Sequence, residues 1–381
     1  MSGVVVALLV AQSTALLVLL ARLLPGYRRT PPVAPLPDGI ADTSVTVLVP
    51  SLDEARRIGK CLDGLVRQGL PMTEAIVVDS RSTDGTQAIV SAYAARDSRI
   101  RLATDLPLPD GWVGKVWALQ YGLSLATGEW VLGMDADTEA EPGLVAAVVN
   151  AARSRGLDVV SFSPLFDGQS NGERWLQPSM LITLVYRFGA PDEHARADRV
   201  MANGQCFLAR RAVLLRHGGY ELARRSFADD VSLARALALR GERVGFLDGR
   251  RLYRVRSYES AREMWREWGR SFDLTDAARA GSQLWDVLLI VLTQGLPVPV
   301  LSAWLLLTGG TAAAGVFGAW IWLNLALLVV RLLLSFAIAG TFARRGAAFW
   351  LSPLSDPLAA VRLVLSSLRR PRQWRGRTYS T

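Results

Sequence analysis

The chain has 381 residues, of which 50% are hydrophobic and 20% charged, and its formal net charge at pH 7 is +9. Two cysteines and two histidines exclude a disulfide framework and a Cys/His metal cluster, and they suit a reducing compartment. The basic residues are mostly arginines at the edges of apolar segments or beside tryptophans, where they suit anionic lipid headgroups. We therefore expect a membrane as partner and no nucleic acid.

The first predicted element is an apolar helix at residues 4–24, with no charged residue before Arg22. About 20 apolar residues suffice to cross a bilayer. Basic residues follow this run and none precedes it, so the positive-inside rule puts the amino terminus outside and the next domain in the cytoplasm. We interpret residues 1–25 as an uncleaved transmembrane anchor, with a cleaved signal peptide as the alternative. A proline-rich linker follows at 26–43.

Residues 44–257 have the composition of one soluble domain. Four short β-rich runs are expected to be strands, at 45–49, 74–78, 130–134 and 157–162. Helical segments alternate with them, near 54–68, 85–96, 115–126 and 142–155. Such alternation predicts an α/β fold with a mainly parallel sheet flanked by helices.

The rest of the chain is predicted to associate with the membrane. Residues 258–283 contain closely spaced tryptophans and arginines, which favour amphipathic helices at the interface. Residues 284–340 hold two apolar runs long enough to span a bilayer, the first of them kinked by prolines. In residues 341–381 we expect an interfacial segment and then a basic cytoplasmic tail. The protein is thus predicted to be a multi-pass protein of the inner membrane.

Polar side chains follow three of the predicted strands, at the point where each strand ends. They lie in the segments Pro50–Glu54, Asp79–Thr86 and Asp135–Asp137. Parallel α/β sheets bind ligands in the crevice beyond the carboxyl ends of their strands. We therefore expect the three segments to line one site.

Asp135 and Asp137 are candidates for a metal site. Two carboxylates on alternate residues can share Mg²⁺ or Mn²⁺, since such ions are held by one or two carboxylates together with substrate phosphates. The ion would neutralise a leaving diphosphate. A solvated turn is the alternative, because Asp is common in turns. The apolar strand WVLGM directly before the pair favours the metal site.

Two further residues are candidates for binding a nucleotide. Asp79 ends an apolar strand at the predicted rim, where it could accept hydrogen bonds from a nucleobase or a ribose. The turn after it is equally explained by capping of the next helix through Ser82 or Asp84. Lys115 is one of only two lysines and follows glycines at a helix start, which suits a phosphate group. A solvated loop lysine is the alternative.

Asp229 and Asp230 open a predicted helix. The helix dipole alone explains one acid at this position. A second acid allows another role, and a carboxylate is a natural general base for the hydroxyl of a sugar acceptor. We expect Asp230 rather than Asp229 to be that base.

Together these segments resemble the family 2 glycosyltransferases. The resemblance covers about residues 44–270 and rests on five signals in the family's order, namely Pro50–Glu54, Asp79–Thr86, Gly111–Lys115, Asp135–Asp137 and Asp229–Asp230. It implies an inverting enzyme with a GT-A fold. Asp53-Glu54 stands where the family usually has Asn-Glu, and Asp229-Asp230 where it usually has Glu-Asp. The Q-x-x-R-W signature of processive synthases is missing, which favours a single transfer.

The resemblance also implies a role for each matching residue. The donor-binding residues would be Pro50, Glu54, Asp79, Lys115 and Asp135, with Glu54 and Asp79 at the nucleoside. The metal would lie on Asp135 and Asp137, and the catalytic acids would be Asp230 and Asp229.

Two phrases, GWVGKVWAL at 111–119 and WLQPSMLITLVYRFG at 175–189, resemble a narrower branch, the membrane glycosyltransferases of carotenoid tailoring and the related hopanoid-associated enzymes. This likeness implies transfer of a hexose from a nucleotide diphosphate sugar, preferably a UDP-sugar, to a hydroxyl of a carotenoid or hopanoid. Residues 175–190 would then lie against lipid. Two alternatives stay open: transfer to a polyprenyl phosphate, and a non-catalytic membrane scaffold with a degenerate nucleotide-binding domain.

Overall fold

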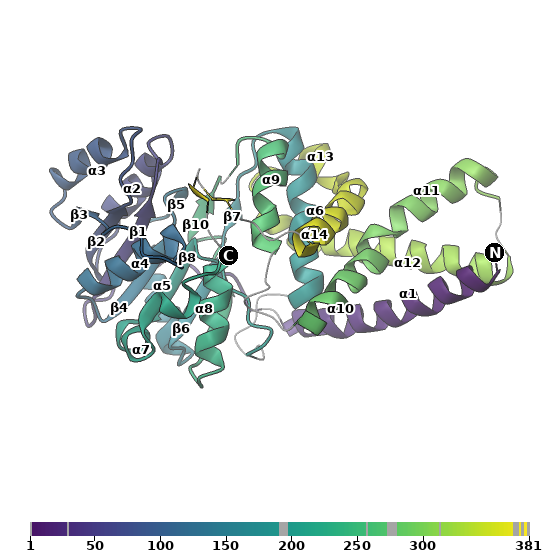
Figure 1. The fold of residues 1–381 in the computed structure, drawn as a ribbon, viewed down its shortest axis with the longest axis horizontal. Helices are drawn as coiled ribbons and strands as arrows, with labels where there is room; N and C mark the ends of the chain where they lie inside the picture. Colours follow the sequence, from purple (N-terminus) through teal and green to yellow (C-terminus); the bar gives the residue numbers. More distant parts are fainter. Residues whose placement is uncertain are drawn as a thin grey trace. The chain divides into compact units, whose positions relative to one another are not determined.

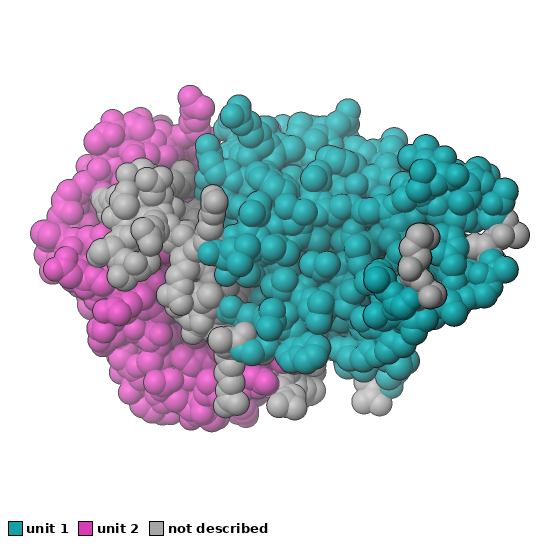
Figure 2. Space-filling model, turned by 45° about the vertical axis from the view of Figure 1, so that its right-hand side comes forward, with its two compact units in different colours: residues 1–29, 167–190, 258–371 teal, residues 30–166, 191–257, 372–381 magenta. Residues whose placement is uncertain are grey.

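The computed structural model describes residues 2–28, 30–189, 197–256, 258–272, 280–311, 314–368, 373–374 and 377–378. The chain divides into two compact units (Figure 2). The first, here called the helical unit, comprises residues 1–29, 167–190 and 258–371. The second, the sheet unit, comprises residues 30–166, 191–257 and 372–381. The soluble domain expected at 44–257 is therefore interrupted, because residues 167–190 cluster with the helical unit.

Seven strands form the main sheet of the sheet unit, in the order β3-β2-β1-β4-β8-β6-β9. In chain order they are β1 (Val45–Ser51), β2 (Met72–Asp79), β3 (Ile100–Thr104), β4 (Trp130–Met134), β6 (Val159–Ser163), β8 (Cys206–Arg210) and β9 (Val244–Asp248). Neighbouring strands are parallel except at β8, which runs antiparallel to both β4 and β6. The expected mainly parallel α/β sheet is confirmed.

Helices and a small second sheet accompany the main sheet (Figure 1). The helices are α2 (Ile58–Val66), α3 (Thr86–Ala94), α4 (Gly114–Leu125), α5 (Leu144–Ser154), α7 (Arg211–Arg216), η2 (Gly219–Ala223) and α8 (Asp229–Ala238). The second sheet has the order β5-β10-β7. Its strands are β5 (Thr138–Ala140), β7 (Leu165–Phe166) and β10 (Tyr253–Val255), and two short strands, β11 (Gln373–Trp374) and β12 (Arg377–Thr378), pair separately.

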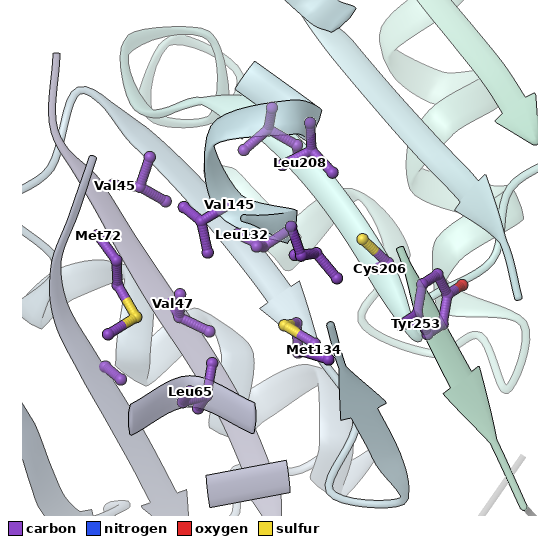
Figure 3. Close-up of a cluster of buried hydrophobic side chains, with 14 of the residues drawn as sticks. Val45, Val47, Leu65, Met72, Leu132, Met134, Val145, Cys206, Leu208 and Tyr253 are labelled. Carbon is purple, nitrogen blue, oxygen red and sulfur yellow. The ribbon is translucent and has the colours of Figure 1, made fainter. Parts of the chain in front are cut away.

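The hydrophobic core of the sheet unit fixes the strand ends. Val47 of β1 and Leu132 of β4 are fully buried, as is Leu65 of α2, and Val145 of α5 is 1% exposed (Figure 3). The parallel strands are apolar on both faces because both faces of such a sheet are covered. The polar residues that follow these strands are therefore held at one edge of a rigid sheet.

In the part of the helical unit that the structure describes, three helices are long and apolar enough to cross a membrane, over Gly3–Tyr27, Gln283–Thr308 and Gly315–Thr341. They contain α1 (Ser2–Leu23), η1 (Leu24–Arg28), α10 (Ala280–Ile290), η3 (Val291–Gly295), α11 (Pro297–Thr308) and α12 (Gly315–Ile338). One amino-terminal and two carboxyl-terminal apolar helices were expected, and this is confirmed. The second helix widens into the π-turn η3 just before Pro297, since proline cannot donate a backbone hydrogen bond.

Shorter helices complete the helical unit: α6 (Asn171–Phe188), α9 (Ala261–Phe272), η4 (Ala339–Thr341), α13 (Gly346–Trp350), η5 (Ser352–Ser355) and α14 (Asp356–Leu368). A capping box formed by Ser170 and Glu173 starts α6. This helix contacts α1, α9, α10, α13 and α14, and every side chain from 175 to 188 is buried or half-buried. Leu181, Leu184, Val185 and Phe188 share one half-buried face of α6, and the expectation that this stretch lies against lipid stays a prediction. Most of the predicted basic tail lies outside the described residues.

Candidate active site

The loops that follow β1 and β2 are joined by hydrogen bonds. The Thr83 amide donates to Asp53 Oδ1, and the Asp53 amide donates to Ser82 Oγ, both at 2.8 Å.

Asp53 and Arg81 have left-handed backbone conformations, with φ of 53° and 65°, which residues other than glycine seldom adopt. The predicted helix near 54–68 starts only at Ile58 because the residues before it form this loop. Two further bonds join the same loops, from the Glu54 amide to Thr86 Oγ1 and from the Ala55 amide to Asp84 Oδ2.

Asp79, the last residue of β2, is fully buried and holds the two loops together. Its Oδ2 accepts from the Ser82 amide at 2.9 Å and from Gln87 Nε2 at 2.6 Å. Its Oδ1 accepts from Ser51 Oγ at 3.2 Å and from Ser82 Oγ. These four bonds use the lone-pair positions that a carboxylate offers. The Asp79 carboxylate is therefore engaged in holding the two loops in shape.

Lys115 and Asp135 form an ion pair at the carboxyl end of β4. Lys115 is the second residue of α4, and its Nζ lies 2.7 Å from Asp135 Oδ1. Burial lowers the pKa of Lys115, but the charges of Asp135, Asp229 and Asp230 outweigh burial and raise this pKa above its ordinary value. Lys115 is therefore a permanent positive charge in the site.

Asp229 and Asp230 are the first residues of α8, and backbone amides hold the second of them. Asp230 Oδ2 accepts from the Gly204 amide at 2.7 Å, and its Oδ1 accepts from the Val231 amide at 2.8 Å. Both oxygens thus have fixed positions. The predicted helix start is confirmed, and the role of Asp230 as base stays a prediction.

The antiparallel strand β8 brings Gly204 to the same edge of the sheet. Cys206 of β8 pairs with Met134 of β4, so the residues before Cys206 lie beside those that follow Met134. A Cβ atom added to Gly204 would lie 3.1 Å from Lys115 Nζ and 3.6 Å from Asp230 Oδ2. Gly204 is therefore packed between the lysine and the acid, with no room for a side chain there unless Lys115 shifts.

Lys115, Asp135, Asp229 and Asp230 form a charged cluster in which burial favours protonation of an acid near neutral pH. Burial raises the pKa of Asp229 to about 7, against the opposing charge of Lys115. Burial also raises the pKa of Asp230, while Lys115 and the two backbone amides lower it. The charges of Asp135, Asp229 and Asp230 all act on the ammonium group of Lys115. The cluster can therefore take up a proton that an exposed carboxylate would not hold.

Residues 46–218 match the family model described as Glycosyl transferase family 2. The match contains the Lys115–Asp135 ion pair and Gly204. This matched segment belongs to glycosyltransferase family 2. The match ends before Asp230, whose place in this family 2 site rests on its contact with the Gly204 amide.

Two curated proteins and one solved structure are similar to this chain. An uncharacterized glycosyltransferase of Escherichia coli is 27% identical over 131 residues, which are 34% of this chain and 37% of that protein. A 4,4'-diaponeurosporenoate glycosyltransferase of Staphylococcus haemolyticus is 29% identical over 129 residues, 33% of each chain. The chain thus spans about a third of the length of these curated relatives. The solved mannosyltransferase PcManGT from Pyrobaculum calidifontis, in complex with GDP-Man and Mn²⁺, has a TM-score of 0.52 and 21% identity over 96% of this chain and 97% of that chain, which shows a similar GT-A fold.

Asp135 and Asp137 fit a metal that is shared with a substrate. Among the described residues, no group of three or more His, Cys, Asp or Glu side chains could hold an ion alone. The two acids nevertheless offer hard carboxylate oxygens after β4, which suits Mg²⁺ or Mn²⁺ bound together with phosphates. Burial is the main cause that raises the pKa of the Tyr253 phenol well above its ordinary value. The negative charges of Asp135, Asp137 and Asp230 raise it further. Asp137 therefore lies close enough to share its electrostatic environment with the other acids.

The remaining predicted residues lie at the joined loops. Pro50 lies in β1 opposite Val78 of β2. Glu54 is 9% exposed, and its Oε2 lies 3.9 Å from a guanidinium nitrogen of Arg57. The structure thus forms two groups, one around Lys115 and one around these loops.

Two residues of the site were not expected, Gly204 and Gln87. An Asn-Gly dipeptide is a turn signal, and it marks Gly204 in the sequence. Its role could not be inferred, because strand β8 was not predicted. Gln87 carries no signal, since its contact with Asp79 arises from the way α3 follows its loop.

Proposed function

We propose that this chain is an inverting, membrane-bound glycosyltransferase that moves a hexose from a nucleotide diphosphate sugar to a hydroxyl group of a hydrophobic acceptor. The observation that carries the proposal is the position of Asp230, fixed by Gly204 beside the Lys115–Asp135 ion pair. One edge of the sheet thereby holds a proton acceptor and a permanent positive charge. Direct displacement at a sugar–diphosphate bond by a hydroxyl group uses both groups.

Asp230 is the proposed general base. It takes the proton from the acceptor hydroxyl while that oxygen forms a bond to the anomeric carbon of the donor sugar. The bond from this carbon to the diphosphate oxygen breaks, the nucleoside diphosphate departs, and the configuration at the carbon is inverted. The raised pKa of Asp230 suits this role, because a base works best when its pKa lies near the working pH.

Lys115 is proposed to stabilise the negative charge that grows on the leaving diphosphate. Fixed charges are most effective where charge develops in the transition state. The ion pair with Asp135 holds the Lys115 ammonium in place before the donor binds. Asp229 supports the same lysine, since its charge helps to keep Lys115 protonated.

Asp135 and Asp137 are the residues proposed to hold Mg²⁺ or Mn²⁺. Such an ion, when bound, supplies positive charge to the diphosphate group. The mannosyltransferase of similar fold was solved with Mn²⁺, which supports a divalent ion in this chain as well.

The two joined loops are proposed to bind the nucleoside, preferably that of a UDP-sugar. We assign the direct contacts to Pro50 and Glu54. Asp79, expected to touch the nucleoside, is proposed instead to keep the loops in shape, because four hydrogen bonds already engage its carboxylate.

The acceptor is proposed to be a carotenoid or a hopanoid, with the sheet unit in the cytoplasm. Three helices long and apolar enough to cross a membrane support a lipid acceptor. The partial similarity to a 4,4'-diaponeurosporenoate glycosyltransferase supports the carotenoid class. The basic residues that follow α1 favour the cytoplasmic side for the domain after it.

The test is sugar transfer by the full chain in detergent, with Mg²⁺ or Mn²⁺, UDP- and GDP-sugars, and an extract of lipids and carotenoids. Mass spectrometry should find a new hexosylated lipid that disappears in Asp137→Ala and Asp230→Asn. If a polyprenyl phosphate is the acceptor, its phosphate needs no base and Asp230→Asn should keep much of its activity. Nucleotide binding without transfer from any donor would favour the non-catalytic scaffold.

A further inference from the structure

Helix α14 presents two different apolar faces. Its inward face is made of small, apolar and polar side chains together with one aspartate at helical spacing, and it packs on η3, α6, α9 and α10. These buried residues are Asp356, Ala359, Ala360, Leu363 and Ser366. The outward face, together with Leu354 of the preceding turn η5, forms a row that we call the apolar stripe. Its members and their exposed fractions are Leu354 (56%), Leu358 (42%), Val361 (50%), Leu365 (38%) and Leu368 (76%).

The outward face of α14 carries no charge. The helix has two charged residues, Asp356 and Arg362. Asp356 points inward and is 2% exposed. Arg362 donates to the carbonyl of Arg266 at 2.9 Å and lies 5.8 Å from the ring centre of Trp265, so its charge is directed towards α9. Water would thus meet only hydrocarbon along the stripe, which is unusual for a soluble surface.

The apolar stripe continues onto α12, a helix that is long enough to span a membrane. Trp350 and Leu351 come before the stripe in the sequence and are 38% and 53% exposed. The Trp350 ring lies 4.7 Å from that of Phe336, a residue of α12 that is 66% exposed. The exposed apolar surface of α12 therefore runs through this aromatic contact to α14, so both surfaces suit the same solvent.

The neighbouring helix α9 has the opposite outward chemistry. Its apolar residues Met264 and Trp268 are buried, while Arg262 and Arg266 are exposed. Helices α9 and α14 contact each other. A charged surface and an apolar surface thus meet at Trp265, and tryptophan and arginine are the residues that collect at the boundary between headgroups and acyl chains.

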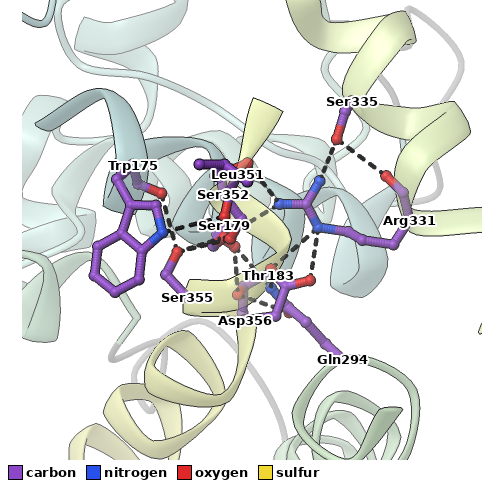
Figure 4. A network of polar contacts seen from close by, with 10 residues as sticks. All are labelled: Trp175, Ser179, Thr183, Gln294, Arg331, Ser335, Leu351, Ser352, Ser355 and Asp356. Carbon is purple, nitrogen blue, oxygen red and sulfur yellow. Dashed lines mark hydrogen bonds and ion pairs between the residues drawn. The ribbon is translucent and has the colours of Figure 1, made fainter. Parts of the chain in front are cut away.

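A buried ion pair fixes the rotation of α14. Arg331 Nε of α12 lies 2.7 Å from Asp356 Oδ2, and each side chain is 3% exposed. Ser179 and Ser352 accept further hydrogen bonds from Arg331, and Gln294 donates to Asp356 (Figure 4). A rotation that buried the stripe would pull Asp356 away from Arg331 and leave both charges unpaired in the interior.

We propose that the apolar stripe is a membrane-contact surface that lies among the acyl chains of one leaflet, beside α12, with the outward face of α9 at headgroup depth. The proposal is independent of the sugar transfer. It assigns lipid contact to residues 350–368, whose apolar side chains are more exposed than those of residues 175–188. A second copy of this chain and a soluble partner are the competing occupants.

The test uses nitroxide labels on the full chain in phospholipid nanodiscs. Leu358→Cys, Val361→Cys and Leu365→Cys report on the stripe. Leu333→Cys on α12, where Leu333 is 63% exposed, is the lipid control, and Arg262→Cys on α9 is the aqueous control. Power saturation measures collisions of each label with O₂, which concentrates in acyl chains, and with a water-soluble nickel chelate. We expect the stripe labels to match Leu333→Cys in both measurements.

Two results would overturn the proposal. Nickel collisions at the stripe equal to those of Arg262→Cys would mean that the stripe faces water. Labels shielded from both reagents would mean a protein occupant, and short distances between labels would identify it as a second copy. Cys61 and Cys206 are fully buried, so labelled wild-type protein measures the background. Each variant is used only if its thermal unfolding and elution volume match those of the wild type.

Discussion

Replacing Asp230 by asparagine changes one oxygen of the proposed base into an amide nitrogen and leaves the size of the side chain nearly unchanged. Both oxygens of Asp230 accept backbone hydrogen bonds, from Gly204 at 2.7 Å and from Val231 at 2.8 Å. Asparagine can accept only one of them, and its NH₂ group then faces the other donor. We expect the free energy of unfolding to fall by about 1–3 kcal/mol.

The larger effect should be on the chemical step. A positioned general base typically contributes roughly 10²- to 10⁴-fold to the rate, which corresponds to about 3–5 kcal/mol of activation free energy. We expect kcat of Asp230→Asn to fall by that factor. The Kd for the nucleotide should change little, because Lys115 and Asp135 are intact. Initial rates at saturating donor, measured by mass spectrometry of the product, and calorimetry of nucleotide binding provide the two numbers.

Asp229→Asn is the matched control, since it removes the neighbouring acid and leaves Asp230 in place. It should lose less activity than Asp230→Asn. The assignment of the base would be refuted if Asp230→Asn kept a kcat close to that of the wild type while Asp229→Asn was the inactive variant. That result would identify Asp229 as the base.

Three further perturbations have expected outcomes. Lys115→Gln removes the permanent positive charge, so transfer should fall by at least tenfold, roughly the effect of one lost transition-state contact, with the folded state retained by circular dichroism. Asp229 has its pKa raised to about 7, so the folded protein binds this proton more tightly than the unfolded chain, and the associated stability falls as the pH rises from about 4 to about 7. Asp229→Asn should therefore raise Tm relative to the wild type above that range and not below it; an equal Tm difference at both ends would contradict the raised pKa. Arg331→Met should cost about 3–5 kcal/mol because it leaves Asp356 unpaired, whereas Arg331→Met combined with Asp356→Leu should recover most of the loss, and unfolding of equal magnitude in both variants would argue against the buried ion pair.

The sequence predicted those strands whose apolar runs were bounded by polar turns. The run at 130–134 matches β4, and the runs at 45–49 and 74–78 lie inside β1 and β2. Strand β8 was missed because its residues, CFLAR, run directly into α7, so no polar turn separates the strand from the helix in the sequence. Its antiparallel place between β4 and β6 depends on contacts across the sheet, which no local pattern contains.

The candidate site was predicted by residue type rather than by contact. Asp135 and Asp230 were expected at strand and helix ends, and the structure finds them there. Their common partner Lys115 is brought to them by the way α4 packs beside the sheet, so the ion pair could not be inferred from spacing. Asp79 is a second example. Its place at the end of β2 was predicted, but the four hydrogen bonds to its carboxylate were not.

The membrane-facing surface could not be predicted from hydrophobicity alone. Residues 175–188 and 354–368 are both apolar, yet only the second segment has an exposed apolar row. The difference arises from packing, since α6 contacts helices on several sides while α14 lies against its neighbours with one face.

The anomeric configuration of the product tests the central claim most directly. With a donor whose sugar is linked to diphosphate in the α configuration, the one-bond carbon–hydrogen coupling at the anomeric carbon of the purified glycolipid distinguishes the two outcomes by nuclear magnetic resonance. Direct displacement with Asp230 as base predicts a β-linked sugar. An α-linked product would contradict this mechanism, because it requires either two displacements or a different reaction path.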